Sequence, residues 1–296
     1  MKNRWILNLV LLALIAGLVA FLYLRPKTEI QSAPEHEVSQ LKLAGITAVK
    51  VEFPAKAAVT FNKVDGYWQM TAPYNLRADQ LSVQRILSVV AATSKSKFPT
   101  TDLAKYGLDN PLVKLTLAGE GGDATFVYGT YNTVTDEQYV AYKEGVYLLN
   151  AAYSEAASTQ VTEMIDKNML APSENKQLVG FDFARLDWED TLSNVAIEKG
   201  QWSTKKPKVT LVQNDMNEWL EFSWKQNPAK SVETYTPNLQ EKYPSFKVKL
   251  ANGKTVHIDV LIESPSMMLA RPDEGLVYSF ANDVGTSMLS PPHTLK

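Results

Sequence analysis

The sequence contains no cysteine and only three histidines among its 296 residues. Without cysteine the chain has no disulfide framework, no thiol nucleophile and no site for a lipid-modified cysteine. The histidines are His36, His257 and His293, and none has a second histidine or a cysteine at the spacing of a zinc site. We therefore expect neither a metal site nor a cofactor.

Sequence signatures of catalysis and nucleotide binding are also missing. The chain has no G-x-S-x-G elbow, no P-loop, no H-E-x-x-H motif and no EF-hand loop. Gly119 to Ala124 has the spacing G-x-G-x-x-A, but it joins two expected strands, whereas a dinucleotide-binding loop joins a strand to a helix. We interpret this segment as a hairpin turn and expect a protein that is not an enzyme.

One acidic cluster keeps an enzyme open as an alternative. In Asp187-Trp188-Glu189-Asp190, strand alternation places Asp187 and Glu189 on the same side. Two carboxylates on one side could bind a cation or act as acid and base. The ordinary interpretation of such a cluster is the solvated face of a strand.

Long apolar runs are absent except at the N-terminus, where Trp5–Leu24 reads WILNLVLLALIAGLVAFLYL. Twenty helical residues at about 1.5 Å each span about 30 Å, the thickness of the hydrocarbon core of a bilayer. The apolar core of a cleaved signal peptide is shorter, and Arg25–Glu29 offers no small-x-small cleavage site. The run predicts an uncleaved anchor with a single transmembrane helix; a cleaved signal peptide is the alternative.

The charges beside this run give no clear orientation. Lys2 and Arg4 precede it and Arg25 and Lys27 follow it, so the positive-inside count is a tie. The free α-amino group favours a cytoplasmic N-terminus, and large domains translocate largely regardless of charge. We expect a single-pass protein of the inner membrane whose bulk is extracytoplasmic. A cytoplasmic domain on an oppositely oriented anchor is the alternative.

The rest of the chain is acidic. Removing the four basic residues of segment 1–27 from the totals of 30 basic and 32 acidic residues leaves 26 and 32, a net charge of −6. Nucleic-acid binding requires a basic surface, and a polybasic grip on anionic lipid does too. The charge therefore argues against nucleic acid as a partner.

After residue 40, a series of residues in the first half of the chain has matches in the same order in the second half. Trp68 and Pro73 match Trp202 and Pro207. Further matches pair Val59 and Phe61 with Val195 and Ile197, and Val83, Ile86, Leu87 and Val90 with Met216, Trp219, Leu220 and Ser223. Such ordered matches predict two tandem copies of one unit. Two unrelated domains with similar hairpins are the alternative.

The coarse pattern of each copy predicts an α+β fold, with hairpins forming an antiparallel sheet and helices on one face. Alternating strands on either side of Asp65-Gly66 predict a tight turn, and helices are expected at 79–93 and 155–168. The expected organisation is an anchor at 1–27 with its transmembrane helix at 5–24, a flexible stalk at 28–40, a first repeat at 41–170, a linker at 171–177, a second, divergent repeat at 178–290 and a tail at 291–296.

Three short motifs carry a family resemblance. They are Gly66-Tyr67-Trp68-x-x-x-x-Pro73, Ala78-Asp79 and Tyr106-Gly107-Leu108-Asp109-x-Pro111. Together they resemble the bacterial family called domain of unknown function 4340, from about Ile46 to Tyr147. The second half keeps Trp202 and Pro207 but has Tyr243-Pro244 in place of the Gly-Leu-Asp turn.

The resemblance implies a membrane-anchored, extracytoplasmic protein. Some relatives resemble auxiliary components of ABC-type transport and gliding-motility systems. The family supplies no catalytic residue that could be carried over. The candidate interaction motif therefore consists of the residues that carry the resemblance and the matching tryptophan: Trp68, Pro73, Tyr106, Gly107, Leu108, Asp109, Pro111 and Trp202.

These residues also have a structural interpretation. Gly107 can supply the left-handed cap of a short helical turn, and Leu108 can pack back onto that turn. The equivalent positions of Trp68 and Trp202 indicate a shared role in packing.

The function expected from the sequence is that of a non-catalytic accessory protein. Trp5–Leu24 would tether it to the membrane, and a membrane-protein complex, for example a transporter, would be its partner. A module that binds cell-wall glycan or an extended peptide through exposed aromatics is the first alternative. An enzyme with a carboxylate site at Asp187 and Glu189 is the second.

Overall fold

A computed structural model of the chain describes residues 14–21, 35–186, 188, 192–238 and 240–295. Two compact units, Met1–Glu35 and His36–Lys296, are distinguished, and each is described by itself. In the first unit residues 14–21 are helical and exposed, and the rest of the predicted span Trp5–Leu24 lies outside the described residues. None of the helices in the described part of the chain is long and apolar enough to cross a membrane.

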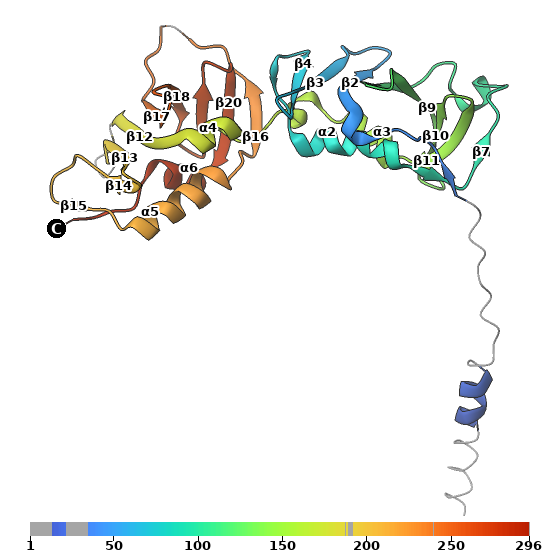
Figure 1. The fold of residues 1–296 in the computed structure, drawn as a ribbon, viewed down its shortest axis with the longest axis horizontal. Helices are drawn as coiled ribbons and strands as arrows, with labels where there is room; N and C mark the ends of the chain where they lie inside the picture. The colour runs from blue at the N-terminus through green and yellow to red at the C-terminus, as the bar shows by residue number, and fades with distance from the viewer. Residues whose placement is uncertain (1–13, 22–34, 187, 189–191, 239, 296) are drawn as a thin grey trace, which may run out of the picture. The chain divides into compact units, whose positions relative to one another are not determined.

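The second unit is mixed α+β, with two large antiparallel sheets (Figure 1). Among the described residues the first sheet has nine strands in the order β5 (Leu76–Arg77), β4 (Tyr67–Ala72), β3 (Val59–Val64), β2 (Ile46–Glu52), β8 (Val113–Gly119), β9 (Ala124–Asn132), β10 (Glu137–Tyr142), β11 (Gly145–Asn150) and β7 (Lys97–Phe98). The second has eight in the order β14 (Gln201–Ser203), β13 (Asn194–Glu198), β12 (Leu178–Arg185), β17 (Ser245–Leu250), β18 (Thr255–Ile262), β19 (Ser266–Arg271), β20 (Leu276–Ala281) and β16 (Ser231–Thr234).

Short strand pairs and helices complete the unit. The pairs are β1 (His36–Glu37) with β6 (Thr93–Ser94) and β15 (Val209–Thr210) with β21 (Thr294–Leu295). The α-helices are α2 (Gln80–Leu87), α3 (Ala152–Ser158), α4 (Pro172–Gln177), α5 (Gln213–Trp219) and α6 (Asn282–Leu289). The 3-10 turns are η1 (Leu43–Gly45), η2 (Ser88–Ala91), η3 (Ala104–Tyr106) and η4 (Val161–Met164), and η5 (Leu220–Lys225) is a π-helix.

The two sheets connect their strands in the same order. In each sheet the chain runs from its first long strand, β2 or β12, through two further strands toward one edge. A helix follows, and the later strands lie on the other side of β2 or β12. Thus β4-β3-β2-β8-β9-β10-β11-β7 has the order of β14-β13-β12-β17-β18-β19-β20-β16, and α2 has the place of α5. The expectation of antiparallel hairpins with helices is confirmed.

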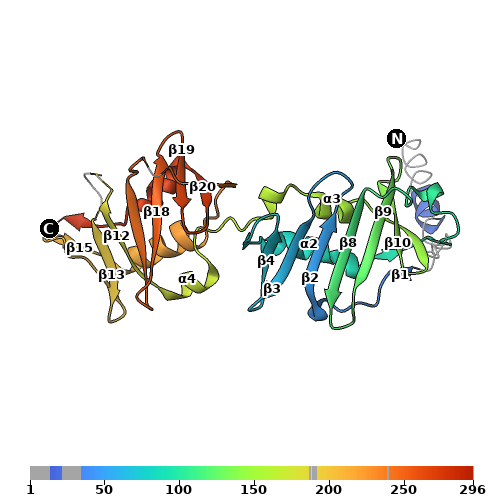
Figure 2. The same ribbon diagram turned by 90° about the horizontal axis from the view of Figure 1, so that it is seen from above.

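Alternation of apolar residues explains where the core lies. Side chains of a strand point alternately to its two faces, so one face of each sheet is apolar and takes the helices. Figures 1 and 2 show α2 and α3 on one face of the first sheet and α5 and α6 on one face of the second. The fully buried side chains include Val51, Phe61, Met70, Leu115 and Phe126 in the first sheet and Phe181, Phe183, Val195, Phe246 and Ile258 in the second.

Two details of the sequence interpretation are wrong. The helix expected at 155–168 is only α3 followed by η4, because Ile165 is extended and pairs with Ala78. The match of Phe61 with Ile197 is displaced by two residues. Lys63 lies opposite Trp68 and Ile197 lies opposite Trp202, so Ile197 corresponds to Lys63. A shift of the alignment by two residues leaves each side chain on the same face of its strand, so the alternation of apolar residues cannot reveal the shift.

Candidate functional site

The turn predicted at Tyr106–Pro111 forms as expected. Gly107 ends η3 with φ 66° and ψ 23°, the left-handed conformation of a helix cap. The amide of Gly107 donates to the carbonyl of Ala104 at 3.0 Å, and that of Leu108 donates to Leu103 at 3.0 Å. The turn is therefore closed by its own backbone, as in other glycine-capped helix ends.

The backbone of this turn lies close to β9, on the face of the first sheet opposite the main core. A Cβ on Gly107 would lie 2.2 Å from the Oγ1 of Thr130, and a Cβ on Gly129 would lie 2.2 Å from the carbonyl oxygen of Tyr106. The Tyr106 ring packs 4.9 Å from the ring of Tyr139, measured between centroids. Leu108 belongs to the same small apolar cluster. Tyr106, Gly107 and Leu108 thus have a packing role.

The other two motif residues of this turn face solvent. Asp109 is exposed and Pro111 is half-buried. With Glu52, Phe53 and Lys114 they line a cleft of about 390 Å³. The fold therefore uses the first half of the motif for packing and leaves the second half at the surface.

Trp68 and Trp202 are buried in the main core, as the shared packing role requires. The backbone of each is held by a glutamine at the start of the following helix. The Trp68 amide donates to Gln80 Oε1 at 2.9 Å and Gln80 Nε2 donates to the Trp68 carbonyl at 3.0 Å. Gln213 makes the same two bonds to Trp202, at 2.7 and 3.0 Å. Each glutamine side chain thus donates and accepts along β4 or β14 as the backbone of a neighbouring strand would.

The structure does not gather the predicted residues into one site. Trp68 lies in the main core, whereas Tyr106 and Leu108 belong to a separate cluster on the other face of the first sheet. Pro73 is exposed just after β4, and Trp202 belongs to the second sheet.

The residues of the two alternative functions are located as follows. Asp187 and Glu189 lie outside the described residues, and within the described part of the chain no group of three or more His, Asp or Glu side chains could hold a metal ion. The three clefts described on the surface, of about 580, 390 and 270 Å³, contain no tyrosine or tryptophan in their linings.

A polar site that the sequence did not reveal lies where the two sheets meet. The strand β5 and the bridge residue Ala78 lie between β4 and residues 164–166. The backbone amide of Asp79 donates to the carbonyl of Met164 at 2.8 Å, and the backbone amide of Asp166 donates to the carbonyl of Arg77 at 2.9 Å. One residue further, Lys167 accepts from the amide of Ala229 at 2.8 Å. The backbone amide of Lys230 in turn donates to the carbonyl of Ser279 in β20 at 2.8 Å. Backbone hydrogen bonds therefore lead from the first sheet to the second.

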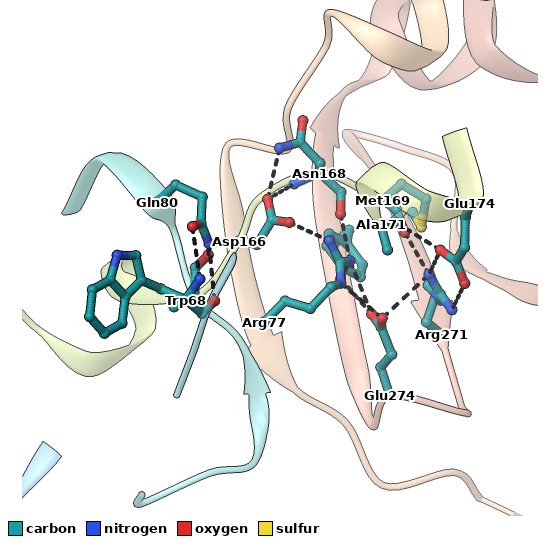
Figure 3. Close-up of polar contacts among 12 residues, drawn as sticks. Trp68, Arg77, Gln80, Asp166, Asn168, Met169, Ala171, Glu174, Arg271 and Glu274 are labelled. Atoms are coloured by element: carbon teal, nitrogen blue, oxygen red, sulfur yellow. Dashed lines mark hydrogen bonds and ion pairs between the residues drawn. The ribbon is translucent and has the colours of Figure 1, made fainter. Parts of the chain in front are cut away.

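Arg77 is the centre of this junction (Figure 3). Its guanidinium donates to the carboxylate of Asp166, to the carbonyl of Asn168 at 2.8 Å and to the hydroxyl of Tyr278 at 3.1 Å. It also makes a two-bond contact with Glu274, at 3.0 and 3.2 Å. The planar guanidinium suits such a set of acceptors better than the single point charge of lysine.

Arg271 holds the other side of the junction and is 2% exposed. It donates to Glu174 at 2.8 and 3.0 Å, to Asp273 at 2.6 and 3.2 Å and to the carbonyl of Met169 at 3.0 Å. Glu174 also accepts from the amide of Ala171 at 2.7 Å, at the start of α4. Arg77 and Arg271 together therefore fix the connection 168–174 between the sheets. We call these two side chains and their acceptors the arginine brace.

The charges of the brace explain its protonation. Burial alone would lower the pKa of Arg77, but the nearby Glu274, Tyr278 and Asp166 raise it above its ordinary value. Burial raises the pKa of Tyr278, and Glu274 raises it further. Tyr278 therefore keeps its proton and donates it to Glu274 at 2.9 Å while accepting from Arg77.

This arrangement holds chain segments together. Every carboxylate of the brace accepts a hydrogen bond from one of the two arginines; these are Asp166, Glu174, Asp273 and Glu274. A buried ion pair adds little net stability, because desolvation offsets the attraction, but removing one partner is costly. The sequence analysis assigned no role to Arg77 or to Arg271, and only the pairing of distant segments gives them one.

The fold and the brace define an α+β protein in which two antiparallel sheets are joined by two arginines. Residues 68–226, just over half of the chain, match the family described as Domain of unknown function (DUF4340), and the chain belongs to this family. The matched region includes both Trp–Gln pairs and Arg77, but it ends before Arg271. It begins later and continues further than the resemblance seen in the sequence. Searches of curated proteins and of solved structures gave no match.

Proposed function

We propose that this chain is a membrane-anchored, extracytoplasmic accessory protein of a membrane complex, without catalysis of its own. The observation that carries the proposal is the twenty-residue apolar run Trp5–Leu24 ahead of a braced two-sheet unit. A run of that length has the span of a transmembrane helix. The charged side chains in the brace are bonded to one another and thus support a structural use.

The proposed topology is a single pass of the inner membrane with a cytoplasmic N-terminus. The flanking basic residues are tied in number, the free α-amino group favours a cytoplasmic N-terminus, and a large following domain translocates largely regardless of charge. The net charge of −6 after residue 27 supports a protein partner over nucleic acid.

The two sheets are proposed to be tandem copies of one unit, residues 41–170 and 178–290, joined by a linker at 171–177. The common strand order supports this, because it includes the helix that follows the third strand. The identical pairs of hydrogen bonds at Trp68–Gln80 and Trp202–Gln213 support it independently. Duplication would supply two surfaces of similar shape for contacts within a complex.

Cross-linking in native membranes followed by mass spectrometry tests the accessory role. The full chain is expected to give cross-links from residues 36–296 to an integral membrane protein. A matched chain that begins at His36 should lose these cross-links if the anchor brings the partners together. Recovery of self-links alone from the full chain would contradict the proposal.

A further inference from the structure

We infer that the arginine brace is a charge-dependent lock that holds the two sheets as one rigid body. The inference stands independently of the anchor and of any partner. It concerns the relation between the first sheet with its helices and the second sheet with its helices, both within residues 36–296. Three observations carry it: the backbone path between the sheets, the reach of Arg77 and the burial of its acceptors.

The backbone path gives the lock its register. Residues 164–167 bond to the strand segment Leu76–Asp79 on one side and to Ala229 on the other. This segment is therefore shared by both sheets, and any rotation of one sheet against the other must break the bond between Ala229 and Lys167. A single amide bond contributes about 0.5–1.5 kcal/mol, which does not hold two sheets by itself.

The reach of Arg77 closes the lock. Its acceptors Asp166 and Asn168 follow η4 of the first half, whereas Glu274 and Tyr278 belong to the second half. The guanidinium of Arg77 thus connects the segment 166–168 to the turn before β20 and to β20 itself. Glu274 also lies 3.4 Å from Arg271, so the two arginines share an acceptor and act on the same contact.

Burial makes the lock depend on charge. The side chains of Asp166 and Glu274 are only 12% and 19% exposed. If the guanidinium of Arg77 is removed, Asp166 loses its cationic partner and keeps only the amide donors of Asn168, in a site that water reaches poorly. Glu274 then keeps only the hydroxyl of Tyr278 and Arg271 at 3.4 Å. An unpaired buried charge is strongly unfavourable. Separation of the sheets at residues 167 and 229 would hydrate both carboxylates, so it is the expected response.

The absence of cysteine makes a direct test clean, because spin labels attach only to introduced thiols. Glu120→Cys and Asn252→Cys place one label in an exposed turn of each sheet. Double electron–electron resonance on the full chain in detergent should give one narrow distance distribution. Arg77→Met should at least double the width of that distribution, and Arg77→Lys should also broaden it, because lysine cannot reach the same set of acceptors.

Lys50→Met is the matched control. It removes a cation that is paired with Glu52 at 2.8 Å within the first sheet and is half exposed. The control should keep the narrow distribution of the parent chain. Amide hydrogen exchange on the same samples should show the central strands of both sheets protected in Arg77→Met, which separates loss of the lock from unfolding.

Glu274→Gln gives a second route if Arg77→Met does not fold. It keeps the shape of the side chain and removes the charge, so it should broaden the distribution in the same way. Distributions as narrow as that of the parent chain in the folded variants would overturn the inference. Broadening that is accompanied by loss of protection inside either sheet would overturn it as well.

Discussion

Gly107 occupies a backbone conformation that only glycine adopts at low cost. Its φ is 66°, and an added Cβ would meet Thr130 Oγ1 at 2.2 Å. A Cβ added to Gly121 would have no neighbour within 4 Å, and the backbone of Gly121 is outside the left-handed region. We expect Gly107→Val to lower the free energy of unfolding by about 1–3 kcal/mol from backbone strain alone, and more from the clash.

Urea unfolding of both valine variants checks this expectation. Gly121→Val should have the midpoint of the parent chain, because its turn is open. Equal midpoints for the two variants would show that the turn at Gly107 tolerates a side chain. The motif at Tyr106–Pro111 would then require an explanation from binding instead of packing.

Tyr128 is the second residue with a testable chemistry. It is 1% exposed, and its hydroxyl has no hydrogen-bond partner among the described residues. An unsatisfied buried polar group costs about 1–3 kcal/mol. We therefore expect Tyr128→Phe to leave stability at pH 7 unchanged or to raise it, and urea unfolding measures the difference. A large loss of stability would indicate a partner for the hydroxyl.

The same substitution should change the response to alkali. Burial raises the pKa of Tyr128 in the folded protein, and Tyr153 raises it further. Above pH 10 the unfolded chain loses this proton and the folded chain keeps it, so stability falls by up to about 1.4 kcal/mol per pH unit. Tyr128→Phe lacks this contribution and should lose stability less steeply between pH 10 and 11.5. Tyr67→Phe, at an exposed position, is the control.

The helices of the two halves share a contact that can be tested at the scale of the element. Gln80 and Gln213 each accept from a tryptophan amide and donate to the carbonyl of the same tryptophan. Glutamate at either position keeps the oxygen that accepts from the tryptophan amide. Its second oxygen replaces the nitrogen that donates to the tryptophan carbonyl, so that hydrogen bond is lost. We expect Gln80→Glu and Gln213→Glu each to lower the free energy of unfolding by about 1–3 kcal/mol.

Gln84→Glu is the matched control, because Gln84 lies on the same helix α2, is exposed and has no side-chain hydrogen bond among the described residues. Thermal unfolding followed by circular dichroism measures all three variants. If only one of Gln80→Glu and Gln213→Glu were destabilised, the helices α2 and α5 would not be held in the same way.

The strands with strong alternation were the elements that could be predicted. Tyr67–Ala72 and Val59–Val64 meet at the expected Asp65-Gly66 turn, because such a turn and period-two burial are local properties. The strand β5 is only two residues long and carries no period. Its place depends on residues 164–166, about ninety positions later, and no local pattern contains that pairing.

The candidate site shows the same limit. The cap at Gly107 was predicted because a helix end depends on a few neighbouring residues. The arginine brace was missed because Arg77 and Glu274 are 197 positions apart in the sequence. A charged residue beside a turn is usually solvated, so neither arginine looked different from a surface residue.

At the scale of the whole molecule, residues 36–296 are expected to unfold as one unit. Most of their buried side chains belong to one hydrophobic cluster that includes both sheets, and the brace adds polar contacts between the sheets. Trp202→Ala should therefore lower the free energy of global unfolding by about 3–5 kcal/mol. The free energy of exchange at the Val49 and Val51 amides, which lie in the other sheet, should fall by the same amount.

Native-state hydrogen exchange measures this coupling at individual amides. Phe222→Ala, at a position that is 58% exposed, is the control and should leave the amides of Val49 and Val51 unchanged. Full protection of these amides in Trp202→Ala would mean that the first sheet unfolds independently of the second.

The distance along the chain between Arg77 and its acceptors also matters during translation. A ribosome that has finished Arg77 must add 197 further residues before Glu274 exists. At about 5–20 residues per second this takes roughly 10 to 40 s. Asp166 and Asn168 exist after 89 and 91 further residues, but the guanidinium at the edge of the nascent first sheet then still lacks Glu274 and Tyr278. The edge is therefore completed only after residues 274–278 have been made, and a chain that terminates before them would leave the ribosome with its first sheet unsealed.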